Sequence, residues 1–424
     1  MTAPPTYKSL LRNREFSGLF AAHTVSILGD VLTKIALSVL VYDRTGSSLT
    51  AALAFALGFV PQILTAAFLS SLVDRLPARR VMLVGDIARM ACVLLMTIPG
   101  TPIWALLALV TVSGALTPAF RAARQTMLPE IVGMQSYALA RSMFSGTIQI
   151  GQTLGFGLGG LLLLLVTPRT ALFIDAASFA VATTVVFLTV QARPATASAH
   201  KDNSGVVRAT WNGNREILAT PLLRRLLLLQ WLPTALIVMP EGLAAPYAQA
   251  LGAGPTAVGL LLAAPATGTA LGEAVIARFL GPHRRAAGVP ALLALATIPL
   301  VGFAFEPTLP VALALLLLSG AGTAYALPLD QAFIENAPLH LRGRAMTLAG
   351  TGSITTQGIA LTAGGLLAEW ISAPWVFAIG GISALMAAAA TGRSRPWRPQ
   401  PATPADRPIP AADETTTHDP TPTQ

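Results

Sequence analysis

Long hydrophobic segments separated by short polar breaks dominate this chain. They begin near residues 17, 49, 81, 102, 138, 170, 222, 256, 286, 308, 345 and 374. Each is close to the roughly 20 residues that an α-helix needs to cross the hydrocarbon core of a bilayer. The pattern predicts about twelve transmembrane helices and therefore an all-α membrane protein.

The composition agrees with a membrane protein and argues against a soluble protein that binds nucleic acid. Of 424 residues, 53% are hydrophobic and 11% are charged, whereas roughly a quarter of the residues of a soluble domain are charged. A net charge of +9 would suggest nucleic acid as the partner of a soluble protein. In a membrane protein the charge instead reflects which loops face the cytoplasm, so we expect no nucleic-acid partner.

The positions of the Lys and Arg residues predict the orientation of the chain. If the N-terminus is inside, nearly all of them fall on one side, and Arg44 and Arg169 fall opposite. Arg121 and Arg124, which follow the fourth hydrophobic segment, belong to the inner group. Because cytoplasmic loops carry the excess of basic residues, both termini are expected on the cytoplasmic side of the membrane. We expect this membrane to be the plasma or inner membrane of a bacterial cell.

The chain divides into two similar halves around a polar segment. Tyr42 and Gly46 in the first half recur as Tyr247 and Gly252, and the basic pair Arg79-Arg80 recurs as Arg284-Arg285. Parallel halves of this kind are typical of some secondary transporters. The expected domains are a cytoplasmic lead (1–16), an N-terminal six-helix bundle (17–190), a cytoplasmic linker (191–220), a C-terminal six-helix bundle (221–392) and a disordered cytoplasmic tail (393–424).

A short basic hinge between the second and third segments, residues 70–83, reads Ser-Ser-Leu-Val-Asp-Arg-Leu-Pro-Ala-Arg-Arg-Val-Met-Leu. It resembles the loop signature Gly-x-x-x-Asp-Arg-x-Gly-Arg-[Arg/Lys] between helices 2 and 3 of the major facilitator superfamily. Ser70, Pro77 and Ala78 depart from that signature. The resemblance implies twelve helices in two pseudo-symmetric six-helix bundles, and a cytoplasmic latch at this hinge with Asp74, Arg75, Arg79 and Arg80. From their positions near the cytoplasmic ends of later spans, Arg89, Arg342 and Arg344 are expected to belong to the same latch.

Three segments at the beginning of the chain resemble one particular branch of this superfamily. The segments Leu-Leu-Arg-Asn-Arg (10–14), Ser-Ile-Leu-Gly-Asp (26–30) and Leu-Val-Tyr-Asp-Arg-Thr-Gly (40–46) resemble the transmembrane secretion effector branch of the superfamily, which is similar to enterobactin exporters. The resemblance implies export of a small organic compound.

Four ionisable residues inside predicted spans are candidates for proton coupling or for lining a cavity. Asp30 and Lys34 are four residues apart in the first span, so they share a helix face and can pair. Glu241 and Glu273 lie in the seventh and eighth spans. Charged residues within a bilayer usually face a water-filled cavity, although a neutral pair that only fixes packing is the alternative. Asp175, in contrast, is expected near the outer membrane interface.

A run of glycines in the fifth span has two possible roles. Gly151, Gly155, Gly159 and Gly160 resemble the superfamily's antiporter signature Gly-x-x-x-Gly-Pro-x-x-Gly-Gly, with Phe156 in the proline position. Small residues at this spacing also allow close packing of helices in any membrane protein.

Other kinds of chemistry find no support in the sequence. There is no phosphate-binding Gly-x-x-x-x-Gly-Lys-[Ser/Thr] loop, and the five histidines and the single Cys92 have no metal-ligand spacing. No nucleophile is placed near a base, so we expect neither an enzyme nor a metal or other cofactor.

These observations together predict a secondary transporter, functional as a monomer, whose partners are a small organic molecule, protons and the lipid bilayer. Proton-coupled export of a drug, antibiotic or siderophore-like metabolite is the main hypothesis. Proton-coupled uptake and a non-transporting receptor or scaffold are the alternatives.

Overall fold

The computed structural model of the protein describes residues 6–58, 61, 76–193, 213–338 and 341–392. Within these ranges the regular structure is helical. The helices of the first half are α1 (Tyr7–Arg12), α2 (Arg14–Thr45), α3 (Ser48–Ala56), α5 (Ala78–Thr97), α6 (Ile103–Val132), α7 (Met134–Leu162) and α8 (Pro168–Thr189).

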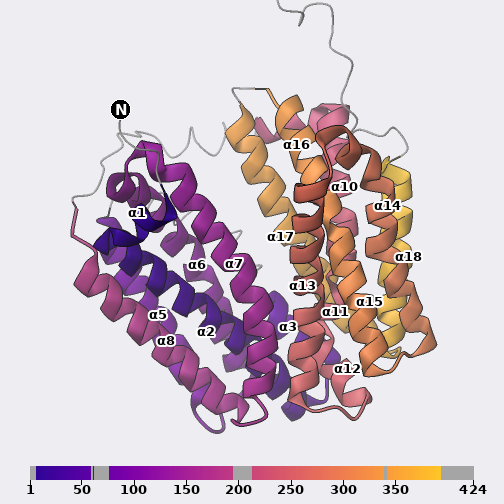
Figure 1. Ribbon diagram of the computed structural model, residues 1–424. Coiled ribbons are helices and arrows are strands. Elements are labelled where there is room, and N and C mark those ends of the chain that lie inside the picture. Colours follow the sequence, from indigo (N-terminus) through magenta and orange to yellow (C-terminus); the bar gives the residue numbers. More distant parts are fainter. Residues whose placement is uncertain (1–5, 59–60, 62–75, 194–212, 339–340, 393–424) are drawn as a thin grey trace, which may run out of the picture.

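The helices of the second half form a separate bundle beside the first (Figure 1). They are α10 (Pro221–Ile237), α11 (Met239–Gly242), α12 (Ala244–Ala250), α13 (Pro255–Phe279), α14 (Pro282–Val301), the 3-10 helix η1 (Gly302–Phe305), α15 (Leu309–Gly322), the 3-10 helix η2 (Thr323–Tyr325), α16 (Ala326–Asn336), α17 (Arg342–Leu367) and α18 (Ala373–Gly392).

Eight helical segments in the described residues are long and apolar enough to cross a membrane. Helices α5, α7 and α17 are also 20, 29 and 26 residues long but are more polar. The predicted second span starts at α3 and then enters residues that the structure does not describe. The all-α membrane class is therefore confirmed, while the count of twelve spans stays a prediction.

The long first helix, α2, has clear sequence signals at both ends. The side chain of Asn13 accepts hydrogen bonds from the backbone N–H groups of Glu15 and Phe16 and so caps the helix start. At the other end Gly46 has a φ of 62°, a left-handed conformation that glycine adopts without steric strain. α2 therefore runs unbroken past Asp30 and Lys34.

The glycines of α7 bring this helix close to α2. Cβ atoms placed on Gly151, Gly155 and Gly159 would lie 2.6, 3.1 and 2.8 Å from side-chain atoms of Ile27, Val31 and Ile35, respectively. The two sets have the same four-residue spacing, so a ridge of α2 fits the glycine face of α7. Close packing of helices is thus one role that these glycines have.

The two bundles meet at one end and separate toward the other, where α1 lies (Figure 1). At the closed end, a Cβ atom on Gly160 of α7 would lie only 2.6 Å from the Cα of Gly259 in α13, so the two backbones touch. Near the same end, the Glu369 carboxylate accepts hydrogen bonds from the Ser47 hydroxyl and the Leu49 N–H, each 2.9 Å long.

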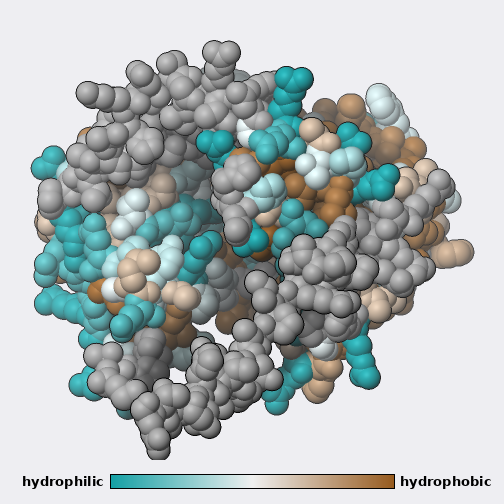
Figure 2. Space-filling model, turned by 90° about the horizontal axis from the view of Figure 1, so that it is seen from above, coloured by the Kyte–Doolittle hydropathy of each residue, from teal (hydrophilic) through white to brown (hydrophobic). Residues whose placement is uncertain are grey.

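The open end differs in its surface. Figure 2, seen from above the view of Figure 1, shows hydrophilic side chains gathered on this face and a hollow near its centre.

Candidate functional site

The described residues line two neighbouring cavities in the interior of the molecule. The larger is about 300 Å³ and is lined mainly by α2, α5, α6 and α7, with a contribution from α17. The smaller is about 240 Å³ and is lined mainly by α10, α11, α13 and α15. Lys34 and Gln152 line both cavities, so these two side chains stand at the boundary between the two volumes.

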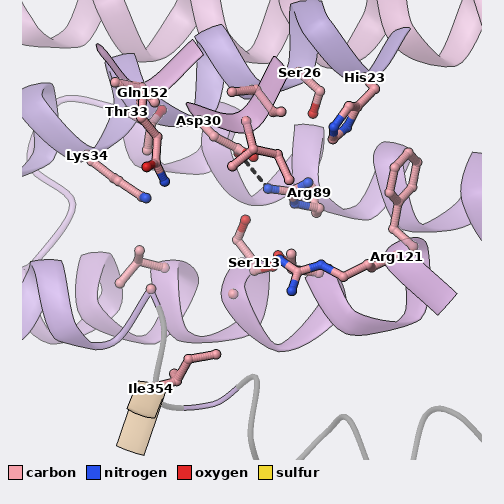
Figure 3. A pocket seen from close by; sticks show the side chains of 18 of the residues that line it. His23, Ser26, Asp30, Thr33, Lys34, Arg89, Ser113, Arg121, Gln152 and Ile354 are labelled. Atoms are coloured by element: carbon pink, nitrogen blue, oxygen red, sulfur yellow. Dashed lines mark hydrogen bonds and ion pairs between the residues drawn. The ribbon is translucent and has the colours of Figure 1, made fainter. Parts of the chain in front are cut away.

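The larger cavity contains an ion pair between two helices (Figure 3). The guanidinium of Arg89 on α5 lies 2.5 Å from a carboxylate oxygen of Asp30 on α2. Arg89 is 5% exposed, and its guanidinium also lies 4.5 Å from the centre of the Phe179 ring. Sequence spacing alone suggested that Asp30 pairs with Lys34 and that Arg89 supports the latch, whereas the structure places Arg89 in the cavity and against Asp30.

Lys34 lies between acids of the two halves. The charges that act on its ammonium group include those of Asp30 and of Glu241. Asp30 lines the larger cavity and Glu241 lines the smaller one. The structure therefore brings together three of the four ionisable residues that the sequence singled out, one acid on each side of a lysine.

The fourth residue, Glu273, lies elsewhere. It is half-buried on α13, lines neither of these two cavities, and interacts electrostatically with Asp330. It was expected with the coupling residues because it lies inside a predicted span, and that role stays a prediction.

Two further acids are buried behind the Asp30–Arg89 pair. Asp175 on α8 is fully buried, and it accepts hydrogen bonds from Thr33 at 2.5 Å and from Ser178 at 3.1 Å. Its expected position at the outer interface was wrong, because the side chain faces α2. Asp86 on α5 is also fully buried, and neither of its oxygens has a hydrogen-bond partner among the described residues.

Two arginines that the sequence placed on the inner surface line the larger cavity instead. α6 continues through Pro118 to Val132, so Arg121 and Arg124 stand on a helix and not in a loop. Arg124 is 7% exposed and contacts His23, with 2.5 Å between the guanidinium and Nδ1. Figure 3 shows Arg121 extending from α6 beneath Arg89. The signal in the sequence was their spacing of three, which places both on one helix face.

The structure covers part of the predicted latch. Asp74 and Arg75 lie outside the described residues. Arg79 donates a hydrogen bond of 2.6 Å to the carbonyl of Phe187 and lies over the ring of the same residue. The remaining latch candidates begin helices near the open end: Arg80 in α5, and Arg342 and Arg344 in α17.

No group of three or more metal-binding side chains occurs in the part of the chain that the structure describes. The site therefore consists of charged groups, hydrogen-bond donors and apolar walls around two neighbouring cavities. Such an arrangement offers both polar and apolar contacts to a small molecule.

Comparison with protein families identifies one matching model. The model of the Major Facilitator Superfamily matches residues 19–244 and 237–421, which together span both bundles.

Named relatives come from mycobacteria. The chain is 27% identical over 368 residues to the multidrug efflux pump Tap of Mycolicibacterium fortuitum, covering 83% of this chain and 88% of the relative. It is 28% identical over 354 residues to the multidrug efflux pump Tap of Mycobacterium tuberculosis, covering 79% of this chain and 82% of the relative.

Solved structures share the fold at low sequence identity. One is a bacterial homologue of the human lysosomal transporter Spinster in an inward-facing and unoccupied conformation. It matches with a TM-score of 0.70 and 15% identity, over 92% of this chain and all of the other. The nucleoside transporter NupG matches with a TM-score of 0.65 and 15% identity, over 89% of this chain and 99% of the other.

Proposed function

The chain belongs to the major facilitator superfamily of secondary transporters, and from this premise we propose that it exports a small organic compound in exchange for protons. It is a multi-pass membrane transporter and not an enzyme. Export is favoured over uptake because relatives that align with about four fifths of the chain are named multidrug efflux pumps.

The orientation we propose places the open end in the cytoplasm. The helix starts that carry Arg14, Arg79, Arg80 and Arg342 lie at this end, and basic residues accumulate on the cytoplasmic side of membrane proteins. Both termini are then cytoplasmic, the cavity opens inward, and the end closed by Gly160 and Gly259 faces outward. A substrate would enter the larger cavity from the cytoplasm or the inner leaflet.

One observation carries the coupling proposal: Lys34 lines both cavities and has an acid on each side, Asp30 in the first half and Glu241 in the second. Lys34 and Asp30 are both on α2, so it is the attraction between Lys34 and charged Glu241 that holds α2 and the α10–α11 segment together, while Asp30 competes for the same ammonium group. When the cavity opens outward, uptake of a proton by one of these acids changes the balance between the two attractions and with it the contact between the bundles. Proton uptake from outside is thereby linked to the conformational change.

The test is transport in proteoliposomes with a pH-sensitive dye inside and a set of candidate drugs and natural products outside. An exporter of this kind must drive a substrate against its gradient when a proton gradient is imposed, and must move protons when a substrate gradient is imposed. Uphill transport without proton movement would overturn the coupling. In cells, deletion of the gene should raise substrate accumulation; a fall would indicate uptake, and no change in either assay would favour a receptor.

The contact of Glu369 with the start of α3 should help to close the outer end. Its carboxylate bonds to two donors at a helix N-terminus, and hydrogen bonds to a charged group are worth roughly 1.5–3 kcal/mol. In Glu369→Ala we expect roughly tenfold faster labelling from outside of a cysteine that replaces Ala266, a residue lining the smaller cavity. Cys92 would be replaced by serine throughout.

Glu306→Ala provides the matched control, since this exposed glutamate also lies at the end of the second bundle that we place outside. Its labelling rate should equal that of the parent. Equal rates in all three proteins would mean that the Glu369 contact does not hold the outer end closed.

The basic hinge remains our candidate for a latch on the cytoplasmic side. Asp74→Asn keeps every basic residue and therefore the positive-inside signal, but removes the acceptor charge. We expect the turnover of this variant to drop at least severalfold with unchanged membrane insertion. Normal turnover would show that the arginines of the hinge serve only as topology anchors.

A further inference from the structure

The walls of the larger cavity carry an excess of positive charge. Lys34, Arg89, Arg121 and Arg124 line it, and Asp30 is the acid among its lining residues. Asp30 is already bound to Arg89. Within the described part of the chain, Arg121 and Arg124 have no acidic group at ion-pair distance, so their two charges face the cavity without an anion.

Arg124 is held in position by neighbours that do not neutralise it. Its guanidinium lies 4.5 Å from the centre of the Phe144 ring and contacts Nδ1 of His23. Because a guanidinium only donates hydrogen bonds, Nδ1 must be the acceptor, and the proton of the neutral imidazole is then on Nε2. Arg124 and His23 are each only 7% exposed, so both side chains are buried and held in place by the surrounding helices.

The Nε2 atom of His23 has no hydrogen-bond partner among the described residues. A buried N–H group without an acceptor is unfavourable by roughly 1–3 kcal/mol. Figure 3 shows the His23 ring directed from α2 into the pocket, on the side where the Arg89 and Arg121 side chains lie. Three groups, Arg121, Arg124 and His23, thus present donors to the same volume, and none of them is paired with an acidic side chain among the described residues.

The rest of the lining combines apolar side chains with uncharged polar ones. Ile27, Val110, Phe120, Ile148 and Ile354 contact the same cavity. A ligand that fits both the cationic part and the apolar part of the wall needs negatively charged hydrogen-bond acceptors at one end and an apolar body at the other. A volume of about 300 Å³ suits a small organic molecule.

We infer that the larger cavity is a binding site for amphiphilic organic anions, whose carboxylate or similar acidic group is held by Arg121 and Arg124 with a donor from His23. This inference rests on the proposed function in taking the cavity as the substrate path. It goes further in stating the charge of the substrate. The basic pair on α6 then acts as a substrate-binding element and not as a topology signal.

Binding of three probes with the same naphthylbutyl body tests the charge preference. They are 4-(1-naphthyl)butanoate, the corresponding alcohol and the corresponding trimethylammonium compound, each measured by equilibrium dialysis against the full chain in nanodiscs of zwitterionic lipid. The anion should bind at least tenfold more tightly than the other two. Equal or tighter binding of the cation would overturn the inference.

Variants identify the residues. The double substitution Arg121→Gln with Arg124→Gln should reduce binding of the anion at least tenfold and leave binding of the alcohol unchanged. The double substitution Arg121→Lys with Arg124→Lys keeps both charges and should retain most of the preference for the anion. Arg141→Gln, which removes one charge at the exposed start of α7, should have no effect. Unchanged anion binding in a double Gln variant that elutes as a single species would contradict the inference, and so would loss of the preference in a folded double Lys variant.

A lipid headgroup could supply the same acidic chemistry, so the measurement is repeated with anionic lipid in the nanodiscs. Retained binding of the naphthylbutanoate supports a small-molecule site, and its complete displacement would assign the site to lipid instead. Because these assays need no gradient, selective anion binding without transport would refute only the proposed export. Transport without selective anion binding would refute only this inference.

Discussion

Asp30→Asn and Glu241→Gln, each introduced alone, will abolish proton-driven export while substrate binding stays measurable. Both acids act on Lys34 from opposite cavities, and each variant removes one protonatable group without changing the side-chain size. We expect uphill transport in proteoliposomes to fall below a tenth of the parent value. Substrate exchange without a gradient should continue in at least one variant, because exchange needs no net proton movement.

Glu273→Gln is the matched control for this prediction, as it makes the same chemical change inside a span at a site that lines neither cavity. It should transport like the parent. If Asp30→Asn and Glu241→Gln both still concentrate substrate, the coupling role of this triad is wrong.

Asp30→Asn should also reduce stability, because Arg89 loses its ion-pair partner in a buried position. Removal of one member of a buried pair lowers the free energy of unfolding by roughly 3–5 kcal/mol, and the loss should be smaller here because the Asp30 side chain is 33% exposed. Glu241→Gln leaves that pair intact, so the thermal unfolding of the two variants should differ, and a comparison separates loss of coupling from loss of structure.

Gly160→Ala should impair transport at least tenfold by keeping the outer ends of the bundles apart. Its new Cβ would lie 2.6 Å from the Cα of Gly259, a contact between backbones that no side-chain rotation relieves. Spin labels at Trp104 and Phe305, two exposed positions at the same end, should report a longer distance between the bundles in a Cys92→Ser background.

Gly157→Ala is the paired control on the same helix. Its Cβ would lie 3.8 Å from that of Ala263, an ordinary contact. Both substitutions gain the same helix propensity of about 1 kcal/mol, so the difference between them isolates the approach of α7 to α13. Similar transport and similar distances in the two variants would show that the Gly160–Gly259 contact is not needed for closure.

Much of the fold followed from the sequence alone. Hydrophobic segments long enough to span a bilayer predicted the helices, because backbone groups in hydrocarbon must bond within their own segment. α2, for example, begins near the predicted start and ends at Gly46. The resemblance at the basic hinge indicated the superfamily, which the family comparison confirmed. The enterobactin-exporter branch and the division into five segments remain predictions.

The candidate site was predictable only where its residues are unusual in a membrane. Asp30, Lys34 and Glu241 stood out because charge inside a span is unfavourable and rarely occurs without a role. Arg121 and Arg124 did not, since an arginine after a hydrophobic segment and a proline is typical of a cytoplasmic loop. That α6 passes through Pro118 without ending depends on neighbouring helices, which tolerate a proline in a packed bundle.

What the sequence determined by itself was therefore the class of the protein, the placement of its helices and three of the charges at its centre, because these depend on local hydrophobicity and on the cost of burying charge. Only the tertiary structure decided that Asp30 pairs with Arg89, that Asp175 is buried against Thr33, and that Lys34 stands between two cavities. Those facts depend on which face each helix turns toward its neighbours. Asp30 and Arg89 are separated by 59 positions in the chain, and Thr33 and Asp175 by 142, so each pair meets only after the helices have packed.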